Sequence, residues 1–137
     1  MKISTKGRYA MRLLIDLNEN QGDGFVALKD IAQRQSISKK YLEQIVPALT
    51  AEGVLKASRG FQGDYRLARE PEDIPVGEVL RLTEGSISPV ACLDSSPNEC
   101  PRCTDCLTLP VWQGLERVIN EYLDGVSLRD VLDGNVK

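Results

Sequence analysis

The sequence predicts a mainly α-helical fold with one small β-hairpin. Three helical patterns occupy the first 51 residues, two short strand patterns around a glycine-bounded turn follow, and the longest helical pattern lies near the C-terminus. A chain of 137 residues is long enough for one compact domain. We therefore expect a single domain with three regions, formed by residues 1–69, 70–106 and 107–137.

The first region contains three expected helices with apolar residues at helical spacing. They span residues 5–19, 28–35 and 39–51. In the third helix the core-facing side chains are Leu42, Ile45, Val46 and Leu49, and the outward-facing ones are Lys40, Glu43 and Gln44. Ser38 is suited to cap its start and Gly53 to end it. Pro47 lacks an N–H, so we expect a bend there.

A short hairpin follows these helices, with strands at residues 54–58 and 64–67 around a turn at residues 60–63. Basic residues occur along it at Lys56, Arg59, Arg66 and Arg69. Two helices joined by a tight turn and followed by a basic hairpin outline a winged helix-turn-helix. In such a module the second helix of the pair enters the major groove of DNA.

The rest of the chain contains a linker at residues 70–75, a helix at 76–82, a loop at 85–106, a long helix at 107–124 and a short helix at 128–132. The apolar stripe of the long helix consists of Val111, Leu115, Val118, Ile119, Tyr122 and Leu123. This stripe can pack within the chain or against a second copy. We favour dimerisation, because a single helix-turn-helix contacts too few bases to be specific.

The net charge of −3 is divided unevenly along the chain. Residues 1–69 carry 12 Lys or Arg and 7 Asp or Glu, whereas residues 70–137 carry 5 and 13. A basic half joined to an acidic half indicates that the first region meets a polyanion.

The candidate DNA-binding residues lie at the start of the first helix, at the start of the third helix and in the hairpin turn. They are Ser4, Lys6, Arg8, Ser38, Lys39, Lys40, Glu43, Gln44 and Arg59. We expect Lys40 to contact phosphate or guanine, Glu43 to accept from a cytosine amino group and Gln44 to pair with adenine. Arg59 is suited to the minor groove or to phosphate. The alternative is that these side chains only solvate exposed faces.

Other features narrow the class of protein. The absence of histidine excludes Ser-His-Asp and Cys-His nucleophilic sites, and the sequence shows neither a nucleophile–base pair nor a phosphate-binding glycine loop, so we expect no enzyme. No apolar run is long enough for a membrane span, and the N-terminus lacks the apolar core of a secretion signal. We expect a cytoplasmic protein whose thiols stay reduced.

All four cysteines lie within fifteen residues: Cys92, Cys100, Cys103 and Cys106. Short spacers let thiolates converge on one metal, as they do in zinc and iron–sulfur sites. A thiol switch using Cys103 and Cys106, or a set of inert thiols, is also compatible with this spacing.

Residues 1–85 resemble the family of winged-helix bacterial transcriptional regulators that includes IscR, NsrR and CymR. The matching segments are residues 6–10, 37–38, 41–44 and 59–60, with Gly63 and Tyr65, and the likeness extends to residues 77–80 and 86–90. The resemblance implies a homodimer that binds a palindromic promoter site in double-stranded DNA. It also implies that Glu43 contacts a base and that Arg59 binds DNA from the hairpin, or wing.

The resemblance adds Tyr41, Gly60 and Phe61 to the expected DNA-binding residues. The wing departs from the family pattern at two positions. Phe61 stands where proline is frequent, and Asp64 stands where glycine is frequent. Asp64 adds a negative charge beside the expected phosphate path.

The resemblance also bears on the cysteines, because the iron–sulfur members carry three cysteines in this loop and a further ligand that is often histidine. Cys92 corresponds to the first of them, but the later spacing differs and histidine is absent. A [2Fe–2S] cluster held by Cys92, Cys100, Cys103 and Cys106 is the favoured site. Three cysteines completed by Asp105 or another group, and a zinc site, remain alternatives.

The expected function is that of a dimeric DNA-binding regulator, a repressor, which senses iron–sulfur status. One alternative is a CymR-like regulator of cysteine metabolism controlled by a partner protein or by thiol redox state. A second is a zinc-stabilised protein-interaction module.

Overall fold

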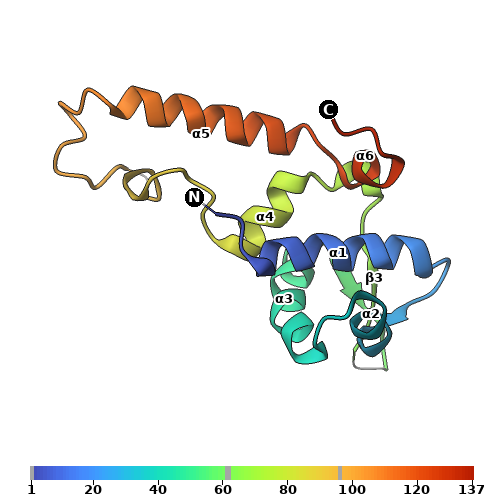
Figure 1. The fold of residues 1–137 in the computed structure, drawn as a ribbon. Helices are drawn as coiled ribbons and strands as arrows, with labels where there is room; N and C mark the ends of the chain where they lie inside the picture. The colour runs from blue at the N-terminus through green and yellow to red at the C-terminus, as the bar shows by residue number, and fades with distance from the viewer. Residues whose placement is uncertain (1, 61–62, 96) are drawn as a thin grey trace.

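The computed structural model describes residues 2–60, 63–95 and 97–137 (Figure 1). Its helices are α1 (Thr5–Asn20), α2 (Leu28–Gln35), α3 (Lys39–Ala51), α4 (Val76–Glu84), α5 (Leu109–Asp124) and α6 (Leu128–Asp133). Its strands are β1 (Val26–Ala27), β2 (Leu55–Ala57) and β3 (Asp64–Leu67), and short 3-10 helices occur at η1 (Pro71–Asp73) and η2 (Ala91–Leu93). The predicted mainly α-helical fold with a small β-hairpin is confirmed, and α3 runs as one helix across Pro47.

The hairpin is part of a three-stranded antiparallel sheet with the strand order β1-β3-β2. In the register of β2 and β3, Leu55 lies opposite Leu67 and Ala57 lies opposite Tyr65. On the other edge of β3, Val26 of β1 also lies opposite Tyr65. A strand of two residues is too short to show an alternating pattern, so no local pattern in the sequence predicts its pairing.

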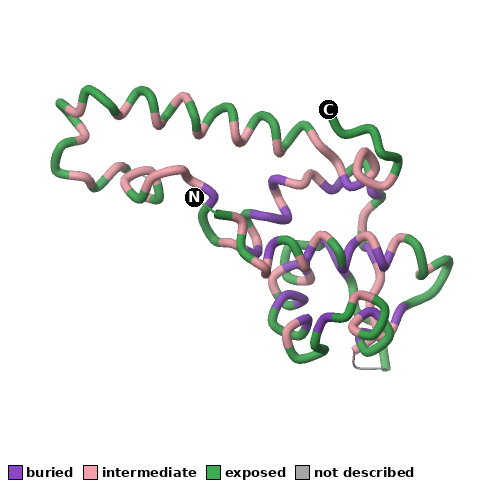
Figure 2. The backbone as a smooth tube through the Cα atoms, viewed as in Figure 1, coloured by how far each residue is buried: buried purple, intermediate pink, exposed green. Residues whose placement is uncertain are grey.

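The core lies between α1, α2, α3 and the sheet, where Figure 2 shows most of the buried backbone. The fully buried large side chains are Leu13, Leu14, Leu17, Leu28, Ile31, Leu42, Ile45, Leu49, Val54, Leu55, Ile74 and Leu128. Burial of each such side chain contributes roughly 1.5–3 kcal/mol relative to exposure in water. Leu42, Ile45 and Leu49 of the predicted apolar face of α3 are among them, and Val46 of the same face is 3% exposed. This buried face fixes which side of α3 faces solvent.

An ion pair with a buried carboxylate joins α1 to α2. Asp16 is 1% exposed, and its carboxylate accepts hydrogen bonds from the Arg34 guanidinium at 2.7 and 3.0 Å. Gln35 donates a further hydrogen bond to Asp16 at 3.0 Å. Burial by itself raises the pKa of Asp16, but the hydrogen bonds from Arg34 and Gln35 and the charge of Arg34 outweigh it and hold this pKa below its ordinary value. The helix pair that presents α3 is therefore fixed by charge as well as by packing.

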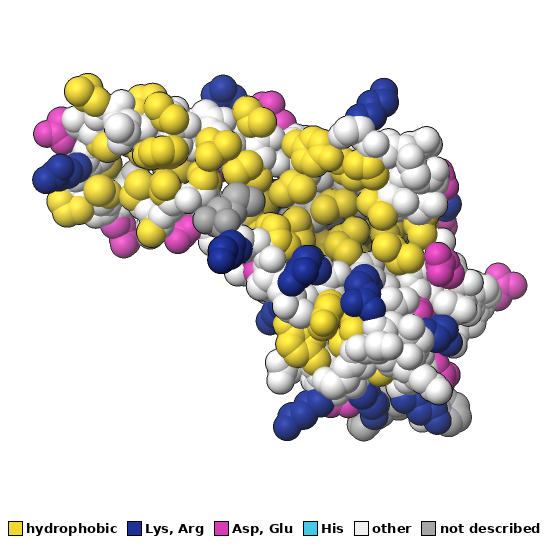
Figure 3. Space-filling model, in the orientation of Figure 1, with side chains coloured by type: hydrophobic (Ala, Val, Ile, Leu, Met, Phe, Trp, Pro, Cys, Tyr) yellow, Lys and Arg dark blue, Asp and Glu magenta, His cyan; other side chains and the backbone are white. Residues whose placement is uncertain are grey.

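The long helix α5 lies away from this core and is reached through α4 (Figure 1). Arg81 of α4 binds Asp124 at 2.5 Å and Asn120 at 3.2 Å. No described residue of α5 is fully buried, and four of the six residues of its predicted stripe are exposed: Val111 is 60% exposed, Val118 56%, Tyr122 50% and Leu115 43%. The other two, Ile119 and Leu123, are half-buried. Figure 3 shows hydrophobic side chains gathered along this part of the molecule. In this single chain the stripe does not pack into the core.

Candidate functional site

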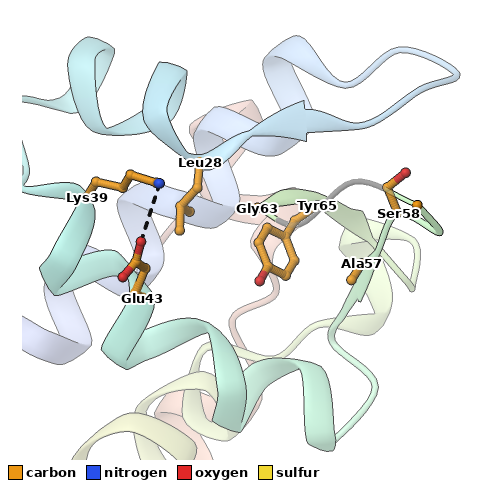
Figure 4. A pocket seen from close by; sticks show the side chains of 8 residues that line it. Leu28, Lys39, Glu43, Ala57, Ser58, Gly63 and Tyr65 are labelled. Carbon is orange, nitrogen blue, oxygen red and sulfur yellow. Dashed lines mark ion pairs between the residues drawn. The ribbon is translucent and has the colours of Figure 1, made fainter.

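The start of α3 and the wing enclose an open hollow on one end of the molecule. The hollow has a volume of about 830 Å³ and is lined by Lys39 and Glu43 from α3 and by Ser58, Gly63 and Tyr65 from the hairpin. In Figure 4 the side chains of the two elements face each other across it. The predicted base-contacting helix and the predicted wing therefore share one face.

The first turn of α3 is organised by its cap. The Ser38 Oγ accepts a hydrogen bond from the backbone N–H of Tyr41 at 3.1 Å, as the sequence predicts. The side chains of Lys39, Lys40, Glu43 and Gln44 are exposed. Ser38 therefore has a structural role at this turn, and the polar residues that follow it are free to meet a ligand.

Glu43 is not an isolated carboxylate. Its Oε1 lies 3.5 Å from the Lys39 Nζ one turn earlier, and each side chain is about half exposed (Figure 4). An exposed pair of this kind is weak, because water and salt screen it. The pair therefore leaves the Glu43 carboxylate free to accept a hydrogen bond from a ligand.

Tyr41 supports α3 from its inner side. Its ring packs edge-on against Tyr9 of α1 at a centroid distance of 5.5 Å, and the Arg12 guanidinium lies 5.2 Å from the Tyr9 ring. Arg12 also donates to the side chain of Gln35 at 3.1 Å. This cluster ties α1 to the start of α3. It also places the exposed Arg12 near the α3 surface, and the sequence analysis did not predict this position of Arg12.

The tip of the wing presents Arg59 and Gly60 to solvent, whereas Phe61 lies outside the described residues. Gly60 has φ +91° and Gly63 has φ +90°, in the left-handed region that favours glycine. These two glycines set the sharp return of the hairpin. Asp64 lies at the start of β3, directly after this turn.

Two of the four basic hairpin residues serve the fold. Arg66 donates to the Gly24 carbonyl at 3.2 Å and lies 5.8 Å from the Phe25 ring. Arg69 binds Glu78 of α4 at 2.6 and 2.9 Å and also binds the Glu52 carbonyl at the end of α3. Arg66 and Arg69 are half-buried, whereas Lys56 and Arg59 are exposed.

The start of α1 holds the remaining predicted DNA-binding residues. The Ser4 Oγ caps α1 by accepting from the Lys6 N–H at 3.2 Å. Arg8 lies within hydrogen-bond distance of the Thr5 hydroxyl at 3.3 Å and is exposed. Lys6 and Arg8 therefore offer their cations at this corner, while Ser4 shapes the backbone that carries them.

The four cysteines lie on the loop between α4 and α5, and all four are free thiols. Within the described residues, no group of three or more Cys, Asp or Glu side chains is gathered closely enough to hold a metal ion. The loop runs beside α5 (Figure 1), and the Ser88 hydroxyl ties it there through a 2.8 Å hydrogen bond to Glu116. The structure thus places the predicted ligands on one loop but does not bring them together.

Cys106 differs from an ordinary surface thiol. Its Sγ lies 3.3 Å from the Thr108 hydroxyl, just before the first residue of α5. The pKa of Cys106 is lowered by hydrogen bonds from the Thr108 hydroxyl and the Thr108 and Leu109 backbones. The positive charge of Arg102 lowers it further. The thiolate, which is the form that binds metals or reacts, is favoured at this position.

The turn before Cys103 is held by Asn98. The Asn98 Oδ1 accepts from the Cys100 N–H at 2.8 Å, and the Cys103 Sγ lies 3.8 Å from the Asn98 carbonyl. Among the described residues, the Asn98 Nδ2 is buried without a hydrogen-bond partner.

Comparison with known proteins decides the family. A family model for Rrf2, described as an iron-dependent transcriptional regulator, matches residues 3–134. The chain belongs to the Rrf2 family. Similar relatives include the regulator CymR of Bacillus subtilis, 40% identical over 96% of this chain and 89% of the relative, and the regulator IscR of Aliivibrio salmonicida, 37% identical over 98% and 79%.

Solved structures support the same assignment. The structure of T. potens IscR matches this Rrf2-family chain with a TM-score of 0.75 and 39% identity, covering 98% of this chain and 88% of that chain. The resemblance predicted from the sequence is confirmed. This Rrf2-family chain is a DNA-binding transcriptional regulator and not an enzyme.

None of the helices in the described part of this Rrf2-family chain has the length and apolar character needed to cross a membrane.

Proposed function

We propose that this chain is a homodimeric repressor, acting in the cytoplasm, that binds a palindromic promoter site and responds to a [2Fe–2S] cluster. The observation that carries the DNA-binding part is the shared face of α3 and the wing. Lys39 and Glu43 of the α3 start and Ser58 and Gly60 of the wing line one open hollow there, and the exposed Arg59 lies between those two wing residues in the sequence. The description of the family as iron-dependent supports the sensing part.

The roles of the DNA-facing side chains follow from their chemistry. Lys40 binds phosphate or the acceptor edge of guanine, Glu43 accepts from a cytosine amino group, and Gln44 pairs with adenine. Arg59 reaches the minor groove or a phosphate from the wing. Lys6 and Arg8 hold the DNA backbone from the start of α1. In this proposal Glu43 supplies specificity, and the cations supply most of the affinity.

The proposed dimer forms through α5. An exposed apolar stripe on a 16-residue helix is costly in water, and burying it against the same stripe of a second copy removes that cost. Two copies then present two α3 helices to two half-sites of a palindrome. The ion pair of Arg81 and Asp124 joins α5 to α4 and so to the winged region. In the proposed dimer, α5 therefore sets how the winged regions of the two copies are held relative to each other.

The donor set of the loop fits an iron–sulfur cluster. The residues that would hold it are Cys92, Cys100, Cys103 and Cys106, and thiolate is the protein ligand that such clusters require. A bound cluster supplies a one-electron redox centre. The chain contributes the acidified Cys106 thiol and a loop that connects the winged region to α5.

The test begins with protein purified without oxygen, whose visible spectrum, iron content and acid-labile sulfide are measured. We expect a coloured protein with iron and sulfide in equal amounts, and a colourless, iron-free protein in the variant with all four cysteines changed to serine. The DNA arm uses a duplex selected by the protein from a randomised pool. Its binding is expected to weaken steeply with salt, because phosphate contacts release counterions. A protein free of iron in every preparation would contradict the cluster assignment.

A second candidate is a CymR-like regulator that responds through thiol chemistry or a partner protein. The similarity to CymR and the acidified Cys106 thiol favour this candidate. If a partner protein controls the regulator, DNA binding survives replacement of all four cysteines. If the thiols control it, peroxide changes the DNA affinity of the iron-free wild-type protein. A zinc-stabilised interaction module would instead hold zinc and show no salt-dependent DNA binding.

A further inference from the structure

The carboxylate of Glu84 caps the start of α1 from the end of another helix. Its Oε1 accepts hydrogen bonds from the Ser4 N–H at 2.8 Å, from the Ser4 hydroxyl at 2.7 Å and from the Gly7 N–H at 3.1 Å. The first N–H groups of a helix have no partner within the helix, and a negative charge there is favourable. Glu84 therefore stabilises the first turn of α1 over a separation of about eighty residues in sequence.

Gly7 makes this contact possible. In an ordinary capping box, the third helical residue is a Glu or Gln that reaches back to the N-cap N–H. Here Ser4 is the N-cap and Gly7 occupies the third helical position, so α1 has no such acid of its own. A Cβ on Gly7 would collide with the Glu84 Oε1 and crowd the Leu80 side chain. The glycine thus leaves room for a carboxylate supplied by α4.

The helix that supplies this carboxylate is also tied to the proposed dimer helix. Glu84 is the last residue of α4, and Arg81 of the same helix binds Asp124 of α5. The turn that Glu84 holds carries Lys6 and Arg8, the proposed phosphate-binding residues of α1. One short helix therefore connects α5 to that phosphate-binding corner.

We propose that Glu84 is a positioning residue for DNA binding: it fixes the first turn of α1 so that Lys6 and Arg8 meet the phosphate backbone. This inference rests on the proposed DNA-binding function. Glu84 acts without touching DNA. Its removal frees the Ser4 and Gly7 N–H groups, and the backbone that carries the two cations frays.

The experiment compares Glu84→Ala, Glu84→Gln and Gly7→Ala with the wild type on the selected duplex, at a temperature where circular dichroism shows each protein folded. We expect Glu84→Ala to bind roughly tenfold more weakly and its salt dependence to decrease by about one phosphate contact. Glu84→Gln keeps an oxygen acceptor and is expected to stay within about twofold of the wild type. Glu19→Ala, which removes one negative charge at the exposed far end of α1, is the matched control and should leave binding unchanged.

The link between Gly7 and Glu84 is tested by the double variant. If both substitutions break one contact, Gly7→Ala combined with Glu84→Ala binds no more weakly than either single variant. Wild-type affinity and salt dependence in Glu84→Ala, or additive losses in the double variant, would overturn the inference.

Amide hydrogen exchange separates this inference from the proposed function. Exchange at residues 4–8 should be faster in Glu84→Ala than in the wild type, whether or not DNA is bound. A wild-type protein without salt-dependent DNA binding would refute the proposed function, whereas unchanged exchange in Glu84→Ala would refute the positioning role alone.

Discussion

At the residue scale, Glu43 is the side chain whose loss should change specificity more than affinity. Its carboxylate is exposed, and Lys39 is its partner at 3.5 Å. In the wild type, the selected duplex should bind more tightly than a duplex changed at the base pair that Glu43 contacts. We expect Glu43→Ala to reduce this difference in binding free energy by about 1–3 kcal/mol at one base pair of each half-site. Lys40→Ala should instead weaken binding to all duplexes equally if Lys40 binds phosphate, and should weaken binding most to duplexes with the contacted guanine if it binds that base. Competition titrations with a set of single-base variants measure both, and equal discrimination in Glu43→Ala and wild type would contradict this role.

Asp16 gives the fold a dependence on pH. Its pKa in the folded protein lies below its ordinary value of 3.8, because hydrogen bonds and the charge of Arg34 outweigh its burial. A carboxyl group with a lowered folded pKa contributes stability that is present above pH 3.8 and is lost as the pH falls through the folded pKa. The contribution should therefore disappear under acid conditions.

Asp16→Asn is the variant that tests this ion pair. We expect it to lower the free energy of unfolding at pH 7 by about 1–3 kcal/mol, because the charge-assisted bonds from Arg34 are lost. The difference between the two proteins should shrink as the pH falls below about 4. Urea unfolding at a series of pH values measures it. A difference that stays constant down to pH 2.5 would show that the charge of Asp16 is not the cause.

At the scale of helices and strands, the sequence predicted most of the fold because the signals are local. The apolar period of α3 and its Ser38 cap are sequence-adjacent features, and both are present in the structure. The pairing of β1 with β3 and the Glu84 cap of α1 join residues far apart in sequence, and no local pattern encodes them. Arg66 and Arg69 are two of the basic residues that the sequence places along the hairpin. Their hydrogen-bond partners, the Gly24 carbonyl and the Glu78 carboxylate, are known only from the folded structure.

The apolar stripe of the long helix α5 is the proposed dimer contact. Val118 is 56% exposed at the middle of the α5 stripe, so a charge there should leave the winged region folded and break the proposed dimer. We expect Val118→Glu to sediment as a monomer at micromolar concentration and to bind the palindromic duplex at least tenfold more weakly. Gln113→Glu, at another exposed position of α5, is the matched control and should stay dimeric. A wild-type monomer in analytical ultracentrifugation would contradict the dimer directly.

At the scale of the whole molecule, the chain joins a basic end to a thiol-bearing end. Figure 3 shows Lys and Arg side chains at the end formed by the winged region, away from the apolar α5. Between them, α4 contacts α1 through Glu84 and α5 through Arg81. The cysteine loop leaves α4 one residue after Glu84, where Gly85 has φ +80°. In the proposed mechanism, a change in the loop acts on the same helix that holds the proposed phosphate-binding corner.

We propose that occupancy of the cysteine loop controls DNA binding. The most direct measurement is a titration of the selected duplex with one anaerobic preparation, before and after its cluster is removed by a chelator. We expect dissociation constants that differ by at least fivefold, with no such difference in the variant that has serine at all four cysteine positions. Identical dissociation constants for the iron-loaded and iron-free wild-type protein would contradict it.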